Sequence, residues 1–193
     1  MLKTVTIFCA SSRKSSEKYK KATIELADIL LENNIKVIYG GGAVGLMGCL
    51  ADRIIEKGGQ IKGVIPEFMI KVEWGHPGVS DMIIVHDMHE RKKLMIENTD
   101  AVIVLPGGTG TLEELMEVLT LKRLGKFVKP IILINTCGFY DKLIGFFGTM
   151  VNNNFIRAEH LDVYRVVKNP ADVIDAINNS PLWDSKSIDS APV

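Results

Sequence analysis

The segment at residues 105–114, LPGGTGTLEE, combines a glycine-rich turn with hydroxyl and carboxylate side chains. An apolar run precedes it and a helical pattern follows, so the turn is predicted to join a strand to a helix. Glycines let the backbone come close to a ligand, and a helix N-terminus offers unpaired N–H groups and a positive dipole end. These features together favour a bound phosphate. The predicted phosphate contacts are Gly108, Thr109, Gly110 and Thr111.

Glu114 has two interpretations. Thr111-x-x-Glu114 has the pattern of a capping box, in which the glutamate returns to the first residue of the helix. A carboxylate one turn into a phosphate-binding helix would also lie close to a sugar attached to that phosphate. The segment is not a Walker loop, because no Gly-Lys-Ser/Thr follows the glycines, and it is not G-x-G-x-x-G.

A second glycine turn, YGGGAVGLMG at residues 39–48, does contain G-x-G-x-x-G, at Gly40, Gly42 and Gly45. Glu67 follows about 20 residues later, which meets the formal dinucleotide pattern. That pattern usually follows the first strand of a domain, whereas here it follows the second. The glycines taken as candidate ligand contacts in this second turn are Gly41, Gly42 and Gly45.

A third group of polar residues is HDMHERKK, at residues 86–93. Asp87-x-x-Glu90 resembles a capping box, which would place Arg91 and Lys92 in the first turns of a helix. There they could bind phosphate or ribose oxygens, or simply form a solvated basic face. The histidines at positions 86 and 89 lack cysteine or carboxylate partners, so no metal site is predicted.

The elements that must position these residues alternate along the chain. Apolar runs without polar alternation predict strands buried on both faces, at residues 4–9, 36–39, 61–65, 82–86, 101–105, 131–135 and 163–167. Helical patterns occupy residues 15–34, 45–59, 88–98, 111–125, 139–153 and 169–179. The order predicts an α/β, Rossmann-like doubly wound parallel sheet of about seven strands with helices on both faces. Ligands of such sheets bind beyond the carboxyl ends of the strands, where both glycine turns fall.

The length of 193 residues and the hydrophobic content of 47% fit a single domain, expected over residues 1–180, with a flexible C-terminal tail at 181–193. Residues 66–80 contain two prolines and two glycines and are predicted to form a long functional loop.

The net charge is formally zero without a Lys/Arg-rich tract, so nucleic-acid binding is not expected. No apolar run approaches the roughly 20 residues of a membrane span. Three cysteines without C-x-x-C spacing indicate reduced thiols and a cytoplasmic protein.

The segments PGGTGTLEE and DMHERK together make the chain resemble the LOG ("Lonely Guy") family of cytokinin riboside 5′-monophosphate phosphoribohydrolases, some of which carry an old "possible lysine decarboxylase" label. The family motif P-G-G-x-G-T-x-x-E matches residues 106–114 without a gap, and M-H-x-R-K matches residues 88–92. The resemblance extends from FCASS, at residues 8–12, to about Ile156.

This resemblance implies a homodimeric hydrolase that needs no cofactor and acts in cytokinin biosynthesis or as an AMP nucleosidase. Its substrate would be AMP or an N6-modified AMP, and its products a free base and ribose 5-phosphate. Arg91 and Glu114 would be the catalytic pair, with Glu114 stabilising the positive charge that develops on the sugar or activating water. The implied substrate contacts are Glu73, Met88, Arg91, Lys92, Gly107, Gly108, Thr109, Gly110, Thr111, Leu112, Glu113 and Thr120.

Three alternatives stay open at this point. The first is a nucleotide-binding sensor or carrier without hydrolysis, which needs both glycine turns but not Glu114. The second is an NAD(P)-dependent oxidoreductase that uses the glycines at residues 40–45. The third is a pyridoxal-phosphate decarboxylase, which would need a Schiff-base lysine that the sequence does not mark out.

Overall fold

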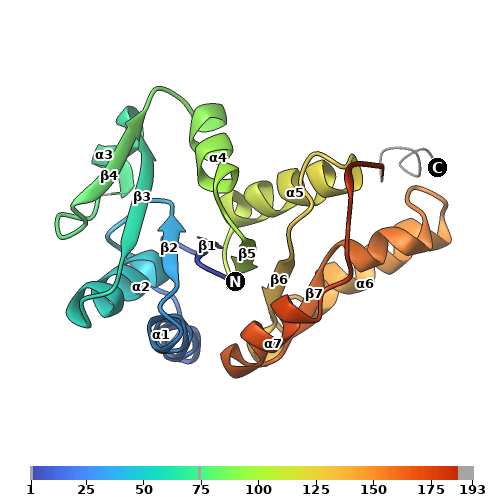
Figure 1. Cartoon of the computed structure of the whole chain (residues 1–193), viewed down its shortest axis with the longest axis horizontal. Coiled ribbons are helices and arrows are strands. Elements are labelled where there is room, and N and C mark those ends of the chain that lie inside the picture. The colour runs from blue at the N-terminus through green and yellow to red at the C-terminus, as the bar shows by residue number, and fades with distance from the viewer. Residues whose placement is uncertain (1, 74, 187–193) are drawn as a thin grey trace.

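The computed structural model describes residues 2–73 and 75–186, and only the backbone of Glu73. At its centre these residues form a seven-stranded sheet in the order β4-β3-β2-β1-β5-β6-β7, and all neighbouring strands are parallel (Figure 1). The strands are β1 (Thr4–Phe8), β2 (Lys36–Tyr39), β3 (Ile61–Pro66), β4 (Asp81–Val85), β5 (Ala101–Val104), β6 (Ile131–Ile134) and β7 (Arg165–Val167). The predicted parallel sheet is therefore confirmed, and every predicted strand overlaps an observed one.

Two apolar clusters cover the two faces of the sheet, which explains why its inner strands lack alternation. One cluster joins the sheet to α1 (Glu17–Glu32), α2 (Gly45–Glu56) and α7 (Val173–Asn178). The other joins it to α4 (Met88–Glu97), α5 (Thr109–Arg123) and α6 (Asp141–Asn152). Figure 1 shows α1, α2 and α7 below the sheet and α4 and α5 above it. The arrangement is the doubly wound one that was predicted.

The direction of winding reverses between β1 and β5. From β1 the chain proceeds through β2 and β3 to β4 at one edge, and then returns to pair β5 with the other side of β1. Crevices at such a reversal, beyond the carboxyl ends of the strands, are the usual ligand sites of open parallel sheets. The loops that follow β1, β2 and β5 meet at this point.

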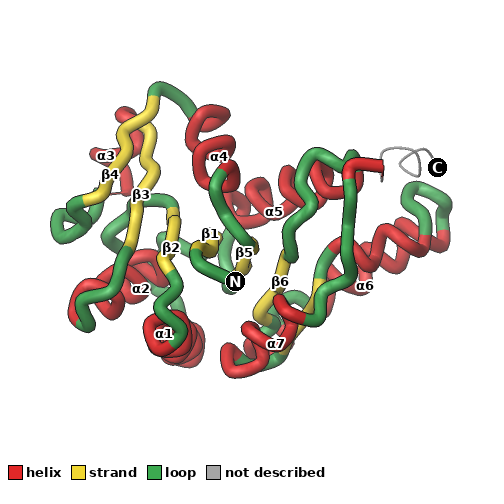
Figure 2. The backbone as a smooth tube through the Cα atoms, viewed as in Figure 1, coloured by secondary structure: helices red, strands yellow, loops and turns green. Residues whose placement is uncertain are grey.

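The loop predicted at residues 66–80 is wrong in its first half, because α3 (Glu67–Glu73) forms there (Figure 2). Glu67 in its first turn and Lys71 in its last complement the helix dipole, a signal too short to stand out beside prolines and glycines. Further on, Gly75 forms an isolated bridge with Gly42 of the second glycine turn. Short 3-10 turns also occur at η1 (Thr136–Gly138), η2 (Ala158–Val163) and η3 (Pro170–Asp172).

The expected C-terminal tail begins with ordered contacts. The Trp183 indole N–H donates to the Lys122 carbonyl at 2.7 Å, and Trp183 packs against the cluster of α4, α5 and α6. Residues 187–193 of the expected tail lie outside the described residues.

Candidate active site

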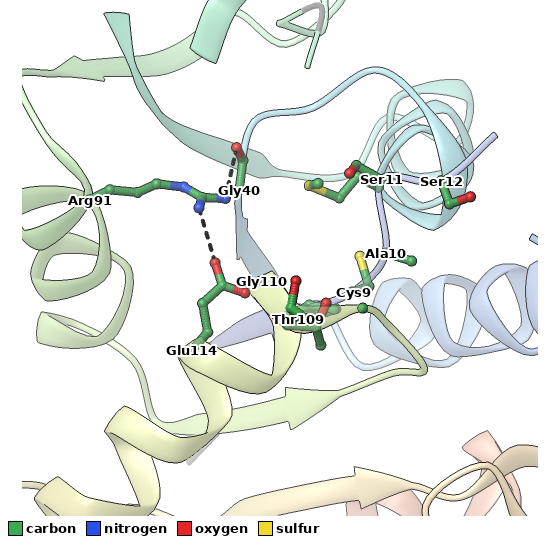
Figure 3. Close-up of a pocket in the computed structure, with 13 residues that line it drawn as sticks. Cys9, Ala10, Ser11, Ser12, Gly40, Arg91, Thr109, Gly110 and Glu114 are labelled. Atoms are coloured by element: carbon green, nitrogen blue, oxygen red, sulfur yellow. Dashed lines mark hydrogen bonds and ion pairs between the residues drawn. The ribbon is translucent and has the colours of Figure 1, made fainter. Parts of the chain in front are cut away.

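A cavity of about 220 Å³ opens where the loops after β1, β2 and β5 meet. Figure 3 shows the Arg91 and Glu114 side chains on one side of it and Ser11 and Ser12 across from them. The residues that line it are Ile7, Cys9, Ala10, Ser11, Ser12, Gly40, Met47, Arg91, Gly108, Thr109, Gly110, Thr111 and Glu114. All four predicted phosphate contacts and both predicted catalytic residues are among them.

The helix of the first glycine turn begins earlier than predicted. Gly108 is the N-cap of α5, and Thr109 is its first residue, so Thr111 lies inside the helix. The capping-box interpretation of Thr111 and Glu114 is therefore wrong, since Thr111 does not occupy the cap position. The Thr111 hydroxyl instead lies over Gly107, where a Cβ would come within 2.0 Å of it.

The packing of the protein does not require glycine at positions 108 and 110. A Cβ at either position would meet no atom within 4 Å, and neither residue has a positive φ. Both line the cavity, beside the first turn of α5, whose N–H groups have no partners within the helix. Their missing side chains leave space for an anion to approach these amides.

Glu114 forms a buried ion pair with Arg91. The Arg91 Nη1 and Glu114 Oε1 atoms are 3.2 Å apart, and the two side chains are only 5% and 7% exposed (Figure 3). The guanidinium also donates to the Val64 carbonyl at 3.2 Å and to the Gly40 carbonyl at 3.4 Å. A Cβ on Gly40 would lie 2.1 Å from Arg91 Nη2, so only glycine leaves room for the guanidinium.

The start of α4 fixes the position of Arg91. The Asp87 carboxylate accepts from the Glu90 N–H at 2.8 Å, and the Glu90 carboxylate accepts from the His86 N–H at 2.9 Å. The Asp87 half of the predicted capping box is thus confirmed, whereas the Glu90 carboxylate accepts from the His86 N–H and not from the Asp87 N–H that a capping box requires. The hydrogen bond from the Glu90 backbone holds the pKa of Asp87 below its ordinary value. Arg91 follows directly in the first turn and points to the cavity.

The second glycine turn does not offer a comparable anion site. The N–H groups of Leu46 and Met47, at the start of α2, both donate to the Ala10 carbonyl, at 2.9 and 3.2 Å. A pyrophosphate at this helix N-terminus would have to displace that carbonyl. The candidate contacts Gly41, Gly42 and Gly45 do not line the cavity, whereas Gly40 does.

A family model described as "Possible lysine decarboxylase" matches residues 47–177. "Cytokinin riboside 5′-monophosphate phosphoribohydrolase LOG1" of Arabidopsis thaliana is 37% identical over 98% of this chain and 94% of its own length. The chain belongs to the LOG family. A second relative, "Probable cytokinin riboside 5′-monophosphate phosphoribohydrolase LOGL2" of rice (Oryza sativa subsp. japonica), is 39% identical over 90% of this chain and 71% of its own length.

Solved structures with the same fold are more distant from this LOG-family chain. The molybdenum cofactor carrier protein of Chlamydomonas reinhardtii superposes with a TM-score of 0.69 at 18% identity, over 92% of this chain and 97% of its own. The molybdenum cofactor binding protein of Rippkaea orientalis gives 0.67 at 19% identity, over 92% and 96%. At this level of identity the likeness concerns the fold alone.

The LOG motif residues divide into those at the cavity and those that support it. Lys92 forms salt bridges to Glu113 and Glu117 and so links α4 to α5. Burial disfavours its charge, but the two carboxylates outweigh that effect and raise the pKa of Lys92. The Thr120 hydroxyl donates to the Met116 carbonyl at 2.8 Å and borders a separate apolar groove. The implied substrate contacts that do not line the cavity are Met88, Lys92, Gly107, Leu112, Glu113 and Thr120.

The wall formed by the residues after β1 was missed as a site by residue-level reasoning. Cys9, Ala10, Ser11 and Ser12 carry no motif of their own, and the sequence marked them only through the family resemblance. Their place at the end of the strand where winding reverses is the signal that could have found them. For Glu73, the structure gives the backbone at the end of α3 and no side-chain position.

The described residues contain no group of three or more His, Cys, Asp or Glu side chains placed to hold a metal ion. Nor does any helix within residues 2–73 and 75–186 have the length and apolar character needed to cross a bilayer.

Proposed function

We propose that this LOG-family chain is a phosphoribohydrolase that cleaves the N-glycosidic bond of a nucleoside 5′-monophosphate. The substrate is AMP or an N6-modified AMP, and the products are the free base and ribose 5-phosphate. The buried pair of Arg91 and Glu114 beside the open turn at Gly108 and Gly110 is the observation that carries this proposal. The names of the relatives, which describe this reaction for cytokinin riboside 5′-monophosphates, support it.

The substrate's phosphate binds at the first turn of α5. Gly108 and Gly110 leave its amides open, and Thr109 and Thr111 add hydroxyl groups at the same wall of the cavity. A dianion is stabilised there by N–H groups and the positive end of the helix dipole. Because the phosphate is remote from the bond that breaks, its binding energy serves to hold the ribose in place for reaction.

Cleavage of the bond between ribose C1′ and the base nitrogen leaves positive charge on the sugar. The Glu114 carboxylate, one helical turn from the phosphate seat, stabilises that charge or accepts a proton from the water that attacks C1′. The base leaves with the electron pair of the bond and takes up one proton, so the net change is addition of water. Arg91 orients Glu114 through their ion pair and presents N–H groups toward ribose oxygens.

The deciding experiment is a substrate panel with the purified full chain. AMP, isopentenyl-AMP, GMP and adenosine are incubated separately, and free base and ribose 5-phosphate are quantified by chromatography. We expect release of base from at least one adenine nucleotide and much slower release from adenosine, which lacks the phosphate. Binding of AMP by calorimetry without release of any base would instead favour the sensor or carrier alternative.

The other two alternatives find less support in the cavity. NAD(P) binding would need the N-terminus of α2, where the Ala10 carbonyl already accepts from Leu46 and Met47. A pyridoxal-phosphate decarboxylase would need a lysine for its Schiff base, and no lysine of the described residues lines the cavity. A fluorescence titration with NADH tests the oxidoreductase alternative, and an absorbance scan for a bound aldimine tests the decarboxylase alternative.

We also propose that the enzyme is a homodimer located in the cytoplasm. The family resemblance supports the dimer, and three cysteines that are widely spaced and lack C-x-x-C spacing fit a reducing compartment.

A further inference from the structure

The cavity has two chemically different ends. Arg91 and Glu114 form a charged end, and the serines at positions 11 and 12 lie across the cavity from them (Figure 3). Within the described residues, Arg91 is the one cationic side chain that lines the cavity, and it is paired with Glu114. A phosphate dianion is repelled by the Glu114 carboxylate, so it is best placed at the far end and bound by neutral donors.

Hydrogen bonds to three parts of the protein fix the backbone of residues 9–12. The Ala10 N–H donates to the Pro106 carbonyl at 3.3 Å, which ties this segment to the first glycine turn. The Ala10 carbonyl accepts from the start of α2, as described above. The Ser12 carbonyl accepts from both the N–H and the hydroxyl of Ser15, at 3.2 and 2.6 Å. Backbone groups of the segment are thus used by the protein, while its hydroxyl groups are not used in this way.

Gly45 makes this arrangement sterically feasible. Its φ is +66°, and a Cβ there would lie 2.6 Å from the Ser11 carbonyl carbon and 2.7 Å from the Ser12 nitrogen. Backbone atoms at that distance cannot move aside as a flexible side chain can. The glycine pattern that suggested a dinucleotide site therefore has another physical role. Gly40 leaves room for the Arg91 guanidinium at one end of the cavity, and Gly45 leaves room for the serine segment, Ser11 and Ser12, at the other.

The hydroxyl groups of Ser11 and Ser12 form no hydrogen bond to a protein group within the described part of the chain, although both residues line the cavity. They line the same cavity as the open turn at Gly108 and Gly110. Two hydroxyl donors opposite a helix N-terminus form the complementary half of an oxyanion site.

We infer that Ser11 and Ser12 complete the phosphate site by donating to oxygens that the first turn of α5 leaves free. Gly45 is a positioning residue for both serines. This inference rests on the proposed function for the identity of the nucleotide, and it deepens that function by explaining the preference for a 5′-monophosphate over a nucleoside.

The test compares Ser11→Ala/Ser12→Ala with Ser16→Ala, a matched control in the same loop. Ser16 is exposed, does not line the cavity and makes no capping hydrogen bond with its side chain. We expect the double variant to raise KM for AMP by about 10-fold or more, as for lost hydrogen bonds to a charged group, with a smaller change in kcat. Its kcat/KM for adenosine stays at the wild-type value, so the preference for the monophosphate shrinks. The control matches the wild type in all three quantities.

A second variant tests the positioning role. Gly45→Ala keeps both hydroxyl groups but displaces the backbone of Ser11 and Ser12, so KM for AMP rises as in the double variant. The circular dichroism spectrum of the variant remains that of the folded wild type. A wild-type KM for AMP in the double variant overturns the serine contacts, and a wild-type KM in folded Gly45→Ala overturns the positioning role.

Calorimetry with ribose 5-phosphate separates this inference from the proposed function. If the wild-type chain releases no base from any nucleotide, the hydrolase proposal fails. Binding of ribose 5-phosphate still tests whether Ser11 and Ser12 contact the phosphate. Weaker binding by the double variant than by Ser16→Ala supports the serine contacts, and equal binding by both overturns them.

Discussion

Glu114 and Arg91 are buried together at the wall of the cavity, and each compensates the charge of the other. A buried charge is costly unless it is paired, and removal of one partner leaves the other without compensation. With 3.2 Å between Nη1 and Oε1, the pair holds a carboxylate where, in the proposed reaction, positive charge would develop on the sugar. The same contact makes truncation of Glu114 a poor test, because an unpaired guanidinium would then stay buried.

Glu114→Gln is the sharper test of catalysis at the residue scale. Glutamine keeps the size of the side chain and an oxygen toward Arg91, but it has no charge and is a poor base. We expect kcat for release of base from AMP to fall by about 10²–10⁴-fold, with the fold retained. Glu113→Gln is the matched control, because Glu113 pairs with Lys92 outside the cavity. Near wild-type turnover in Glu114→Gln would show that the carboxylate is structural.

Gly40→Ala tests whether the guanidinium must stay where it is. The new methyl group would lie 2.1 Å from Arg91 Nη2, so the side chain has to move away from the Gly40 carbonyl and from Glu114. We expect kcat/KM for AMP to fall by about 10-fold or more, since misplacement of such a group by about 1 Å is costly. Gly148→Ala in α6 is the control, because a Cβ there meets no atom within 4 Å. Equal activity of the two variants would contradict the proposed role of Arg91.

At the scale of elements, the sheet was predictable because its inner strands are largely buried on both faces and are rich in Val and Ile. The sequence pattern predicts the start of α5 two residues too late, because Gly108 at the N-cap lacks the polar side chain that usually identifies this position. The motifs identified Arg91 and Glu114, but the wall at Ser11 and Ser12 has no residue type that signals chemistry. It belongs to the site because parallel pairing of β1 with β5 brings the two loops together, a long-range fact that local patterns do not contain.

The C-terminal end of α5 contains a buried lysine whose titration affects stability. Lys122 is 2% exposed, and its ammonium group donates to the Lys129 carbonyl at 2.8 Å. Burial, and then the positive charge of Arg165, lower the pKa of Lys122 from its ordinary 10.5 to about 8. Between these two values the unfolded chain binds more protons than the folded chain, so this lysine's contribution to stability rises with pH.

We therefore expect the free energy of unfolding of the wild type, relative to Lys122→Met, to increase between pH 7 and pH 10. Urea unfolding at both pH values measures the difference, and other titrating groups cancel in the comparison. Lys126→Met is the control, because Lys126 is exposed. A difference that stays constant or decreases across this range would contradict the lowered pKa.

At the scale of the whole molecule, the fold gathers loops from opposite halves of the chain at one crevice. The sheet winds outward from β1 in both directions, so residues near positions 11, 40, 91 and 110 surround a single cavity. Each wall is supported by an element other than its own: α2 accommodates the serine segment through Gly45, and β2 and β3 hold Arg91 through backbone carbonyls. Substitutions in loops that are far apart in the sequence are therefore expected to affect the same kinetic constants, kcat and KM for the nucleotide.

The proposed homodimer calls for an apolar surface, and α5, α6 and η2 provide one. They form a groove whose lining includes Leu119, Phe147 and Met150. Phe146 and Phe155, adjacent in sequence to lining residues, are 54% and 73% exposed. Large exposed apolar areas of this kind mark contact surfaces between protein chains. A second copy of the chain packed on this groove would remove them from water.

We expect light scattering to give the wild type twice the 21.3 kDa mass of one chain, and Met150→Glu to give a single chain, because a charge in the groove cannot be buried unpaired. Phe68→Glu on α3 is the matched control, since Phe68 is 60% exposed and lies away from the groove on another element. Dissociation by Phe68→Glu but not by Met150→Glu would move the interface to the α3 surface. A monomeric wild type with full hydrolase activity would show that one chain contains the complete site.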